Sequence, residues 1–306
     1  MTAVVGRLGV WRPGRLLTPE YAASLEEFEY STIWVGGSPP GDLGIVERLL
    51  AATNSITVAT SIVNIHTASA DVVAASYARI QERYAGRFVL GIGVGHRESD
   101  GPRYVRPYEQ VQRYLDDLER FGVSPDDIML AALGPRLLRL ARDRTAGAHP
   151  YLTTPEHTRN AREILGPAPL LAPEQKIVID RDPARARTVA RTSVADRSLQ
   201  RVNYVSNMRR LGFSDADLAG RGSDALLDAL VAHGDPAEAV RRIRSHLDAG
   251  ASHVAAQVLT GDASDSGLAS YQAVAAEFLT NEVGSGRLPG ERDRRPTRDT
   301  TSRRHH

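Results

Sequence analysis

Stretches with the periodicity of strands and of helices alternate along the chain from end to end. The strand-like stretches are short and apolar, and residues 56–65 are rich in β-branched side chains, which suits burial on both faces of a sheet. The helix-like stretches place apolar residues on one face, as in Val73, Tyr77, Ile80 and Tyr84, spaced four, three and four residues apart. This alternation predicts an α/β protein with a parallel sheet and crossover helices.

Eight strands can be counted, with helices between them. We predict strands at residues 6–12, 31–38, 56–65, 88–95, 128–133, 146–152, 176–179 and 253–259. After the seventh strand, residues 182–262 are mostly helical and long enough to hold an insertion before the last strand. Because no linker-like break divides the series, the pattern predicts a closed TIM-type (β/α)8 barrel in a single domain of residues 1–283.

The composition permits one large core. The chain has 306 residues, 42% of them hydrophobic and 25% charged, as in a typical soluble globular protein. It has no cysteine, which excludes disulfides, iron–sulfur ligation, thiolate zinc sites and a cysteine nucleophile. No stretch approaches the ~20 apolar residues of a membrane span, and the N-terminus lacks the pattern of a signal peptide. We therefore expect a cytoplasmic protein with no membrane partner.

Positive charge is concentrated at the carboxyl end. Residues 284–306 contain seven arginines and three acidic residues, whereas the rest of the chain has 31 basic and 34 acidic residues. A slightly acidic body is a poor general binder of nucleic acid, so we expect no such partner. The tail has one aliphatic residue and two prolines, too little apolar surface to order it. We expect residues 284–306 to be a disordered Arg-rich tail, and an arm for an anionic partner is the alternative.

The fourth predicted strand has an unusual glycine pattern. Gly91, Gly93 and Gly95 alternate with apolar residues, so a period-two strand would turn all three glycines to one face. A glycine face weakens a strand unless something must approach its backbone closely. Either a planar ring lies against this face, or neighbouring barrel side chains pack tightly there. A dinucleotide-binding fingerprint is excluded, because Glu98 stands where the third glycine should fall.

Two further candidates follow strands, where the reactive groups of such a barrel lie. Gly134-Pro135-Arg136 stands where a strand becomes a helix, and the free amides of a helix start favour an anion such as phosphate; ordinary punctuation before a helix is the alternative. His96 directly follows the glycine-rich strand, and an ordinary histidine pKa of about 6.5 suits proton transfer near neutrality. A histidine that only hydrogen-bonds the cofactor or a loop carbonyl is the other interpretation.

Other strand ends carry aromatic and basic residues. Trp11 and Trp34 end neighbouring strands and would form an aromatic wall of a substrate pocket, or else pack in the core. His66 follows the third strand and would line the same pocket, or else be a half-exposed structural histidine. Lys176, the only lysine, is expected at the start of its strand and on the wrong face of the barrel, which argues against Schiff-base chemistry. No motif of a metal site, a serine-hydrolase elbow or a phosphate-binding loop is present.

Several segments together resemble one family, the luciferase-like oxidoreductases, and within it the actinobacterial subgroup described as F420-dependent. The segments, which span roughly residues 6–283, are 31–36, 56–64, 90–96, 114–118, 130–135, 146–152 and 248–254. The resemblance implies a TIM-type barrel with the cofactor ring in its mouth and the phosphate on backbone amides of Leu133, Gly134 and Pro135. It also implies a cis peptide bond between Ser61 and Ile62, in a bulge that backs the deazaflavin.

The resemblance further implies a homodimer. Together with the strand-end residues above, it leads us to expect a cofactor site of Ser61, Ile62, Asn64, Gly93, Gly95, His96, Leu133, Gly134 and Pro135, and a substrate site of Trp11, Trp34 and His66. Well-known F420-dependent dehydrogenases of the family carry a glutamate where this chain has His96. The role of His96 as the catalytic proton-transfer residue is therefore a hypothesis, and the sugar-phosphate and simple alcohol dehydrogenases are poor guides to the substrate.

The function expected from these observations is hydride transfer between F420 and a C=C or C=N bond of a small organic molecule, for instance in secondary metabolism. One alternative is an FMN-dependent monooxygenase that uses O2. The other is a non-redox barrel that acts as a cofactor-free catalyst or a binding protein.

Overall fold

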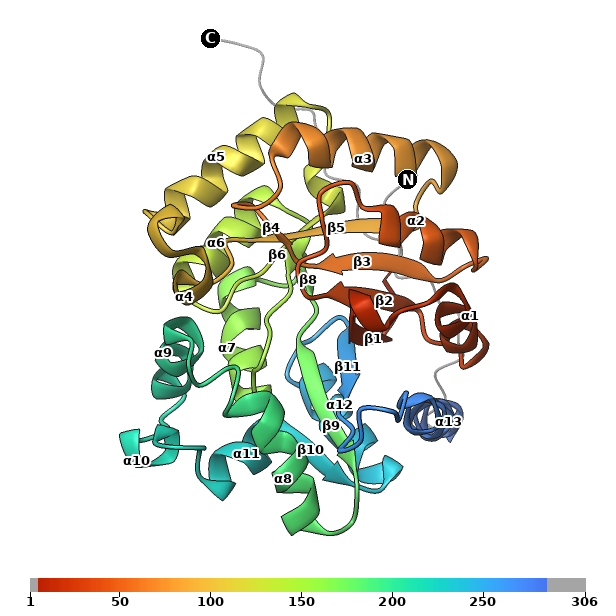
Figure 1. Cartoon of the computed structure of the whole chain (residues 1–306), viewed down its shortest axis with the longest axis vertical. Coiled ribbons are helices and arrows are strands. Elements are labelled where there is room, and N and C mark those ends of the chain that lie inside the picture. Colours follow the sequence, from red (N-terminus) through yellow and green to blue (C-terminus); the bar gives the residue numbers. More distant parts are fainter. Residues whose placement is uncertain (1–4, 285–306) are drawn as a thin grey trace.

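The computed structural model describes residues 5–284, and its strands and helices confirm the predicted α/β barrel (Figure 1). The strands are β1 (Leu8–Pro13), β2 (Thr32–Gly36), β3 (Thr57–Ser61), β4 (Val63–Asn64), β5 (Phe88–Gly93), β6 (Ile128–Leu130), β7 (Gly147–Ala148), β8 (Leu170–Leu171), β9 (Glu174–Ile179), β10 (Val231–Gly234) and β11 (Val254–Val258). The helices are α1 (Pro19–Glu27), α2 (Gly44–Ala51), α3 (Ala70–Arg83), α4 (Arg97–Asp100), α5 (Pro107–Arg120), α6 (Pro135–Arg144), α7 (Pro155–Leu165), α8 (Pro183–Val194), α9 (Val202–Arg210), α10 (Asp215–Leu218), α11 (Asp224–Leu230), α12 (Pro236–Asp248) and α13 (Leu268–Gly284), with 3₁₀ turns at Gly14–Leu16, Gly101–Arg103 and Pro125–Asp127. The predicted Arg-rich tail lies outside the described residues apart from Gly284, which ends α13. Over the described part of the chain, no helix is long and apolar enough to cross a membrane.

The strands form a ring of parallel neighbours in the order β11, β1, β2, β3, β5, β6 and β7. The ring is completed by β8, which pairs with β7, and β9, which pairs with β11. Only Ala172 and Pro173 separate β8 from β9, and backbone bonds continue through this joint, since Ala172 donates to Ala148 and Ala255 donates to Pro173. Together β8 and β9 therefore serve as one strand that closes the barrel, and each predicted strand corresponds to a member of this ring.

Several predicted strands are longer than the ladders that form. The expected strand at 128–133 shortens to β6 and the one at 146–152 shortens to β7. Residues beyond these ladders stay partly or fully buried. The amides of Ala131 and His149 still donate to carbonyls of the neighbouring strands, at Ile92 and Leu130, whereas the Leu152 amide donates to a side-chain oxygen of Glu174. The apolar pattern of these residues therefore reflects their burial and not membership of a strand. The predicted strand at 56–65 is likewise interrupted at Ile62, which separates β3 from β4.

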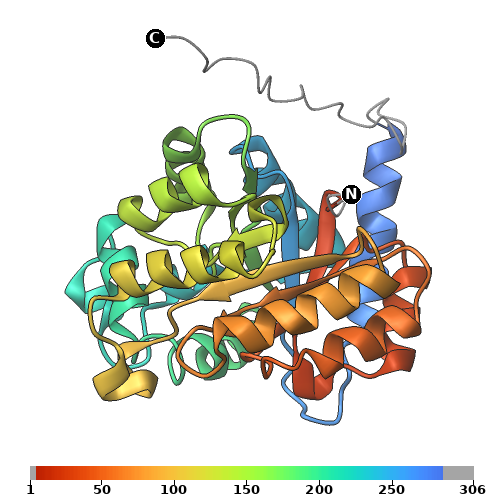
Figure 2. The ribbon, with the colours of Figure 1, turned by 90° about the horizontal axis from the view of Figure 1, so that it is seen from above.

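Two apolar layers lie on either side of the strands. The outer layer packs the ring against its helices, and α3 and α5 lie side by side outside β5 (Figure 2). The inner layer fills the barrel with Trp11, Trp34, Ala59, Val89, Met129, Ala146, Ala172 and Ala255. The many alanines leave room for two indole rings, so large and small side chains share the interior.

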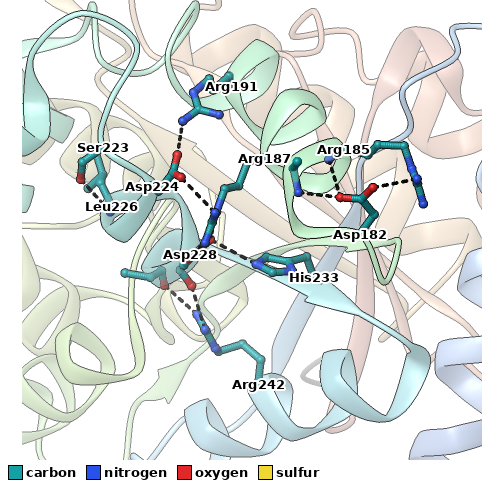
Figure 3. Close-up of polar contacts among 12 residues, drawn as sticks. Asp182, Arg185, Arg187, Arg191, Ser223, Asp224, Leu226, Asp228, His233 and Arg242 are labelled. Atoms are coloured by element: carbon teal, nitrogen blue, oxygen red, sulfur yellow. Dashed lines mark hydrogen bonds and ion pairs between the residues drawn. The ribbon is translucent and has the colours of Figure 1, made fainter.

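The predicted insertion before the last strand contains α8 to α11 and also β10, a strand that the sequence pattern did not indicate. β10 pairs with β9 in parallel register, Val231 opposite Lys176. Ion pairs join α8 to α11 (Figure 3): Arg187 contacts both Asp224 and Asp228, at 2.9 Å and 2.5 Å, and a second arginine of α8 pairs with Asp224. Apolar side chains of the insertion form one cluster with Leu152 and Val178 of the barrel, so the insertion packs as a wall against the barrel.

Candidate active site

The carboxyl ends of β3 and β5 form one side of the barrel mouth. The peptide bond between Ser61 and Ile62 is cis, as the resemblance implies. A Cβ on Gly91 would overlap the carbonyl oxygen of Thr60, and a Cβ on Gly93 would come within 3.0 Å of the Ile62 side chain. Close packing of neighbouring segments therefore accounts for Gly91 and brings the backbone of Gly93 against Ile62.

Gly95 does not share the face of these two glycines, contrary to the sequence expectation. β5 ends at Gly93, and Gly95 has a φ of 68°, in the left-handed region that favours glycine. The chain therefore turns at Gly95 and carries His96 away from the strand.

Asn64 and Asp100 fix this turn. Asn64 Nδ2 donates to the two carboxylate oxygens of Asp100 at 3.1 and 3.3 Å, and Asn64 Oδ1 accepts from the His66 amide at 2.9 Å. Asp100 also accepts from the His96 amide at 3.0 Å. Both ends of the Asn64 side chain are engaged within the protein, so its contacts orient the loops that hold His66 and His96.

Ser61 is held by two partners inside the barrel. The Trp11 indole donates to Ser61 Oγ at 2.7 Å, and Ser61 Oγ lies 2.8 Å from His149 Nε2. His149 Nδ1 lies 2.6 Å from the carbonyl oxygen of Ala172, which only accepts, so Nδ1 carries the hydrogen and Nε2 accepts from Ser61. Burial lowers the pKa of His149 to about 3, so the ring stays neutral and is a poor base for Ser61. The trio positions Ser61 and does not activate it as a nucleophile.

The two predicted substrate tryptophans have different surroundings. Trp34 is fully buried, stacks on His149 with ring centroids 4.1 Å apart, and donates to His253 Nε2 at 2.9 Å. Trp11 reaches Ser61 at the end of β3 and packs against Tyr151, with ring centroids 5.2 Å apart. Trp34 therefore packs in the core, whereas Trp11 lies next to the mouth.

The side chain of Lys176 points into the barrel. The prediction that Lys176 lies at the start of its strand, on the barrel face away from the active site, was wrong. β9 begins at Glu174, so Lys176 is the third residue of its strand, and its side chain is fully buried. Its Nζ donates to Glu174 Oε1 at 2.9 Å and Gln257 Oε1 at 3.0 Å, and lies 3.8 Å from the Tyr151 ring centroid. Burial lowers the pKa of Lys176, and the ion pair with Glu174 opposes that shift. The ammonium group is enclosed by these partners, which still argues against a Schiff base.

His96 faces helix α9 of the insertion. His96 Nδ1 lies 3.0 Å from Asn203 Oδ1, and the ring packs against Tyr204 with centroids 5.2 Å apart. Because the amide oxygen accepts, Nδ1 carries the hydrogen and the neutral ring presents a lone pair at Nε2. Burial lowers the pKa of His96, so the neutral form predominates near neutrality. Glu98 accepts from the Val202 amide at 2.9 Å and so docks α9 beside α4 (Figure 1).

The start of α6 forms the next polar feature along the mouth. Gly134 precedes the helix and Pro135 is its first residue. His157 Nε2 lies 2.9 Å from the Leu133 carbonyl and fixes this turn from α7. The Arg210 guanidinium, at the end of α9, lies 3.8 Å from the position of a Cβ on Gly134.

The charge beside Gly134 comes from the insertion. Arg136, which the sequence offered for this role, instead lies 4.2 Å from the ring centroid of Tyr108 on α5. Sequence reasoning missed Asn203, Asn207 and Arg210, although their spacing of four and three residues places them on one face of α9. This polar stripe is visible in the sequence, but only the fold brings it to the ends of β5 and β6.

A metal centre has no candidate in this part of the molecule. Within residues 5–284, no three histidine or acidic side chains cluster closely enough to hold an ion.

Comparison with known proteins agrees with the resemblance. A family model described as luciferase-like monooxygenase matches residues 18–121. A 5,10-methylenetetrahydromethanopterin reductase from Methanolobus tindarius is 24% identical over 287 residues, covering 77% of this chain and 88% of the reductase. These matches confirm the resemblance to luciferase-like proteins and support an oxidoreductase.

Solved structures share the fold. An F420-dependent secondary alcohol dehydrogenase in complex with an F420–acetone adduct has a TM-score of 0.69 at 14% identity, covering 90% of this chain and 99% of its own. The oxygenating constituent of 3,6-diketocamphane monooxygenase from Pseudomonas putida, in complex with FMN, has a TM-score of 0.64 at 14% identity, covering 92% and 99%. The TIM-like barrel is thus confirmed, and the similar structures include users of F420 and of FMN.

Proposed function

We propose that this protein is an F420-dependent oxidoreductase that transfers a hydride between the deazaflavin and a C=C or C=N bond of a small organic molecule. The family-model match and the barrel support an oxidoreductase of the luciferase-like class. The relative from Methanolobus tindarius is a reductase, and a similar structure is an F420-dependent dehydrogenase, which favours F420 over FMN.

The proposal rests on one observation: His96 and the start of α6 lie at the same edge of the barrel. His96 follows β5 and Gly134 follows β6, and these two strands are paired. The residues of α9 that approach them, Asn203 and Arg210, are separated by about 10 Å along the helix at about 1.5 Å per residue. Because these two strand ends are adjacent, a ring near His96 and a phosphate near Gly134 fit a single ligand.

The cofactor would be held by backbone and small side chains. Free amides in the first turn of α6, after Leu133 and Gly134, would bind its phosphate. The ring would lie against Ile62 and Gly93, beside the Ser61 hydroxyl that Trp11 and His149 hold in place. When bound, F420 would supply the hydride in the reduction direction and accept it in the oxidation direction, and the protein supplies position and proton transfer.

His96 is the proposed proton-transfer residue. Asn203 orients its ring, so Nε2 is the atom that exchanges the proton with the substrate. In the oxidation direction neutral His96 accepts a proton at Nε2, and in the reduction direction protonated His96 donates it. The lowered pKa of His96 favours the accepting form at neutral pH.

The substrate would enter beside His66. Its Nε2 is buried and has no hydrogen-bond partner within the described structure, and the Tyr104 ring lies 6.2 Å away between centroids. A polar atom of the substrate would satisfy this nitrogen, with Trp11 as a second contact nearer Ser61.

Titration of the purified protein with F420 and with FMN tests the cofactor assignment. We expect F420 to bind, with a change in its absorbance, and to be oxidised or reduced in the presence of imine or enone substrates. Binding of FMN without F420 would overturn the assignment and favour the monooxygenase. His96→Gln should bind F420 within twofold of the parent but turn over more slowly, and unchanged turnover would remove His96 from the proposal.

A further inference from the structure

Arg210 differs from other arginines of the insertion. Arg187, Arg191 and Arg209 each pair with an aspartate, whereas Arg210 has no carboxylate within ion-pairing distance among residues 5–284. Partial burial lowers the pKa of Arg210, with no acidic group acting in the opposite direction. Arg210 therefore places an uncompensated positive charge beside Gly134.

Asn207 adds a buried donor to this charge. The residue is 1% exposed, and its Oδ1 accepts from the Arg210 guanidinium at 3.2 Å. Its Nδ2 is buried without a hydrogen-bond partner in the described part of the chain. Buried amide hydrogens are nearly always bonded in folded proteins, so this one points to a ligand or water that completes it. The hydroxyl of Thr153, in the adjacent loop between β7 and α7, is also buried without a partner there.

The first turn of α6 supplies the opposite side. The helix has ten residues, and its first amides have no intrahelical acceptor and form the positive end of the helix dipole. Burial lowers the pKa of His157, the bond to Leu133 opposes this, and the charge of Arg210 lowers it further. The positive potential of Arg210 thus extends to the Leu133 carbonyl turn.

We infer that Asn207 and Arg210 of the insertion complete the phosphate site proposed above at the first turn of α6, so that this site is shared between the insertion and the barrel. Where the phosphate belongs to the cofactor, the inference rests on the proposed function and deepens it. Asn207 and Arg210 are then specificity determinants for a phosphorylated cofactor over its nucleoside. A free phosphate or a phosphorylated substrate presents the same chemistry.

The test compares pairs of ligands in which one member carries the phosphate group and the other lacks it. Dissociation constants are measured for F420 and its deazaflavin nucleoside, and for FMN and riboflavin, with the parent protein, Arg210→Met and Asn207→Asp. Arg209→Met is the matched control, because this neighbouring arginine pairs with Asp215. We expect Arg210→Met to weaken the phosphorylated ligand about tenfold, equivalent to about 1.4 kcal/mol, and the nucleoside by less than twofold. Asn207→Asp places a carboxylate against the phosphate and should weaken it at least as much.

Each outcome decides a different question. Equal weakening of phosphorylated and unphosphorylated ligands by Arg210→Met, or none, would overturn the inference. Equal affinity of the parent protein for both members of a pair would overturn it while leaving the proposed function intact. If none of the four ligands binds, the proposed function fails, and the midpoint of thermal unfolding in inorganic phosphate becomes the readout. A rise in the parent that is lost in Arg210→Met retains the site for another phosphate source, and no rise rejects it.

Discussion

Replacing Lys176 with methionine tests the charge buried in the barrel. Methionine keeps most of the side-chain length but removes the ammonium group, which is fully buried against Glu174, itself 1% exposed. The variant leaves the Glu174 carboxylate inside the barrel with one bond at its other oxygen, from the Leu152 amide at 3.1 Å. Gln257 also loses a donor at 3.0 Å.

The expected loss follows from removing one partner of a buried pair. Such a change destabilises proteins by about 3 to 5 kcal/mol, because the remaining charge is desolvated and uncompensated. At roughly 2 to 4 °C per kcal/mol for a large domain, the midpoint of thermal unfolding should fall by roughly 6 to 20 °C. Chemical denaturation followed by circular dichroism measures the free energy directly.

A double variant provides the control. Lys176→Met with Glu174→Gln removes both charges and keeps an acceptor for the Leu152 amide, so it should recover most of the lost stability. A loss below about 1 kcal/mol in the single variant would refute the reasoning, since a buried pair predicts several times more. A double variant less stable than the single one would refute it as well.

Three further variants test other parts of the structure. In the oxidation direction, kcat of the parent should rise with pH to a plateau, with a pKa below 6.5. His96→Gln should remove this pH dependence and lower kcat roughly 100-fold. A pH–rate profile measures both effects. Gly91→Ala should destabilise the protein by about 3 kcal/mol, because its Cβ would overlap the Thr60 carbonyl; urea denaturation measures this. Thr158→Val should cost about 1 to 3 kcal/mol by the same assay, because it leaves Nδ1 of the buried His246 without the bond that Thr158 makes at 2.7 Å.

Controls and contrary outcomes are specific to each variant. A flat pH profile in the parent would contradict the role of His96. Gly44→Ala is the control for Gly91, because its Cβ would stand 3.7 Å from the nearest atom at the start of α2, and its effect should stay within about 1 kcal/mol. A stable Gly91→Ala would show that β5 and Thr60 move apart easily. Thr158→Ser keeps the hydroxyl, and a loss as large as that of Thr158→Val would assign the effect to packing.

The barrel was predictable because its signal is local. β-branched runs and one-sided helical stripes recur at the right spacing, and each marks a strand or helix without reference to the rest of the chain. Strand ends were less predictable, because Leu152 is apolar through burial while its amide bonds outside the ladder. The same limitation misplaced Lys176, since the start of β9 at Glu174 depends on pairing with β11.

The site was predictable only on the barrel side. His96 and Gly134 lie at the ends of strands that the periodicity of the sequence predicts. Their partners Asn203 and Arg210 come from a helix much later in the chain, and no local pattern states where that helix docks. Glu98, which accepts a hydrogen bond from the Val202 amide, is part of the contact that docks α9. No local sequence pattern indicates this role either.

The attachment of the insertion has a consequence for how such a barrel diversifies. The pairing of β10 with β9 and the ion pairs of α8 with α11 hold both ends of the segment that contains α9 and α10. When the ends of a loop are already fixed, doubling its length costs only about 0.6 kcal/mol of closure entropy. A different or longer segment would change the wall over His96 and Gly134 while the ring of strands kept nearly all of its stability. The wall over the candidate site can thus change without a matching change in the core.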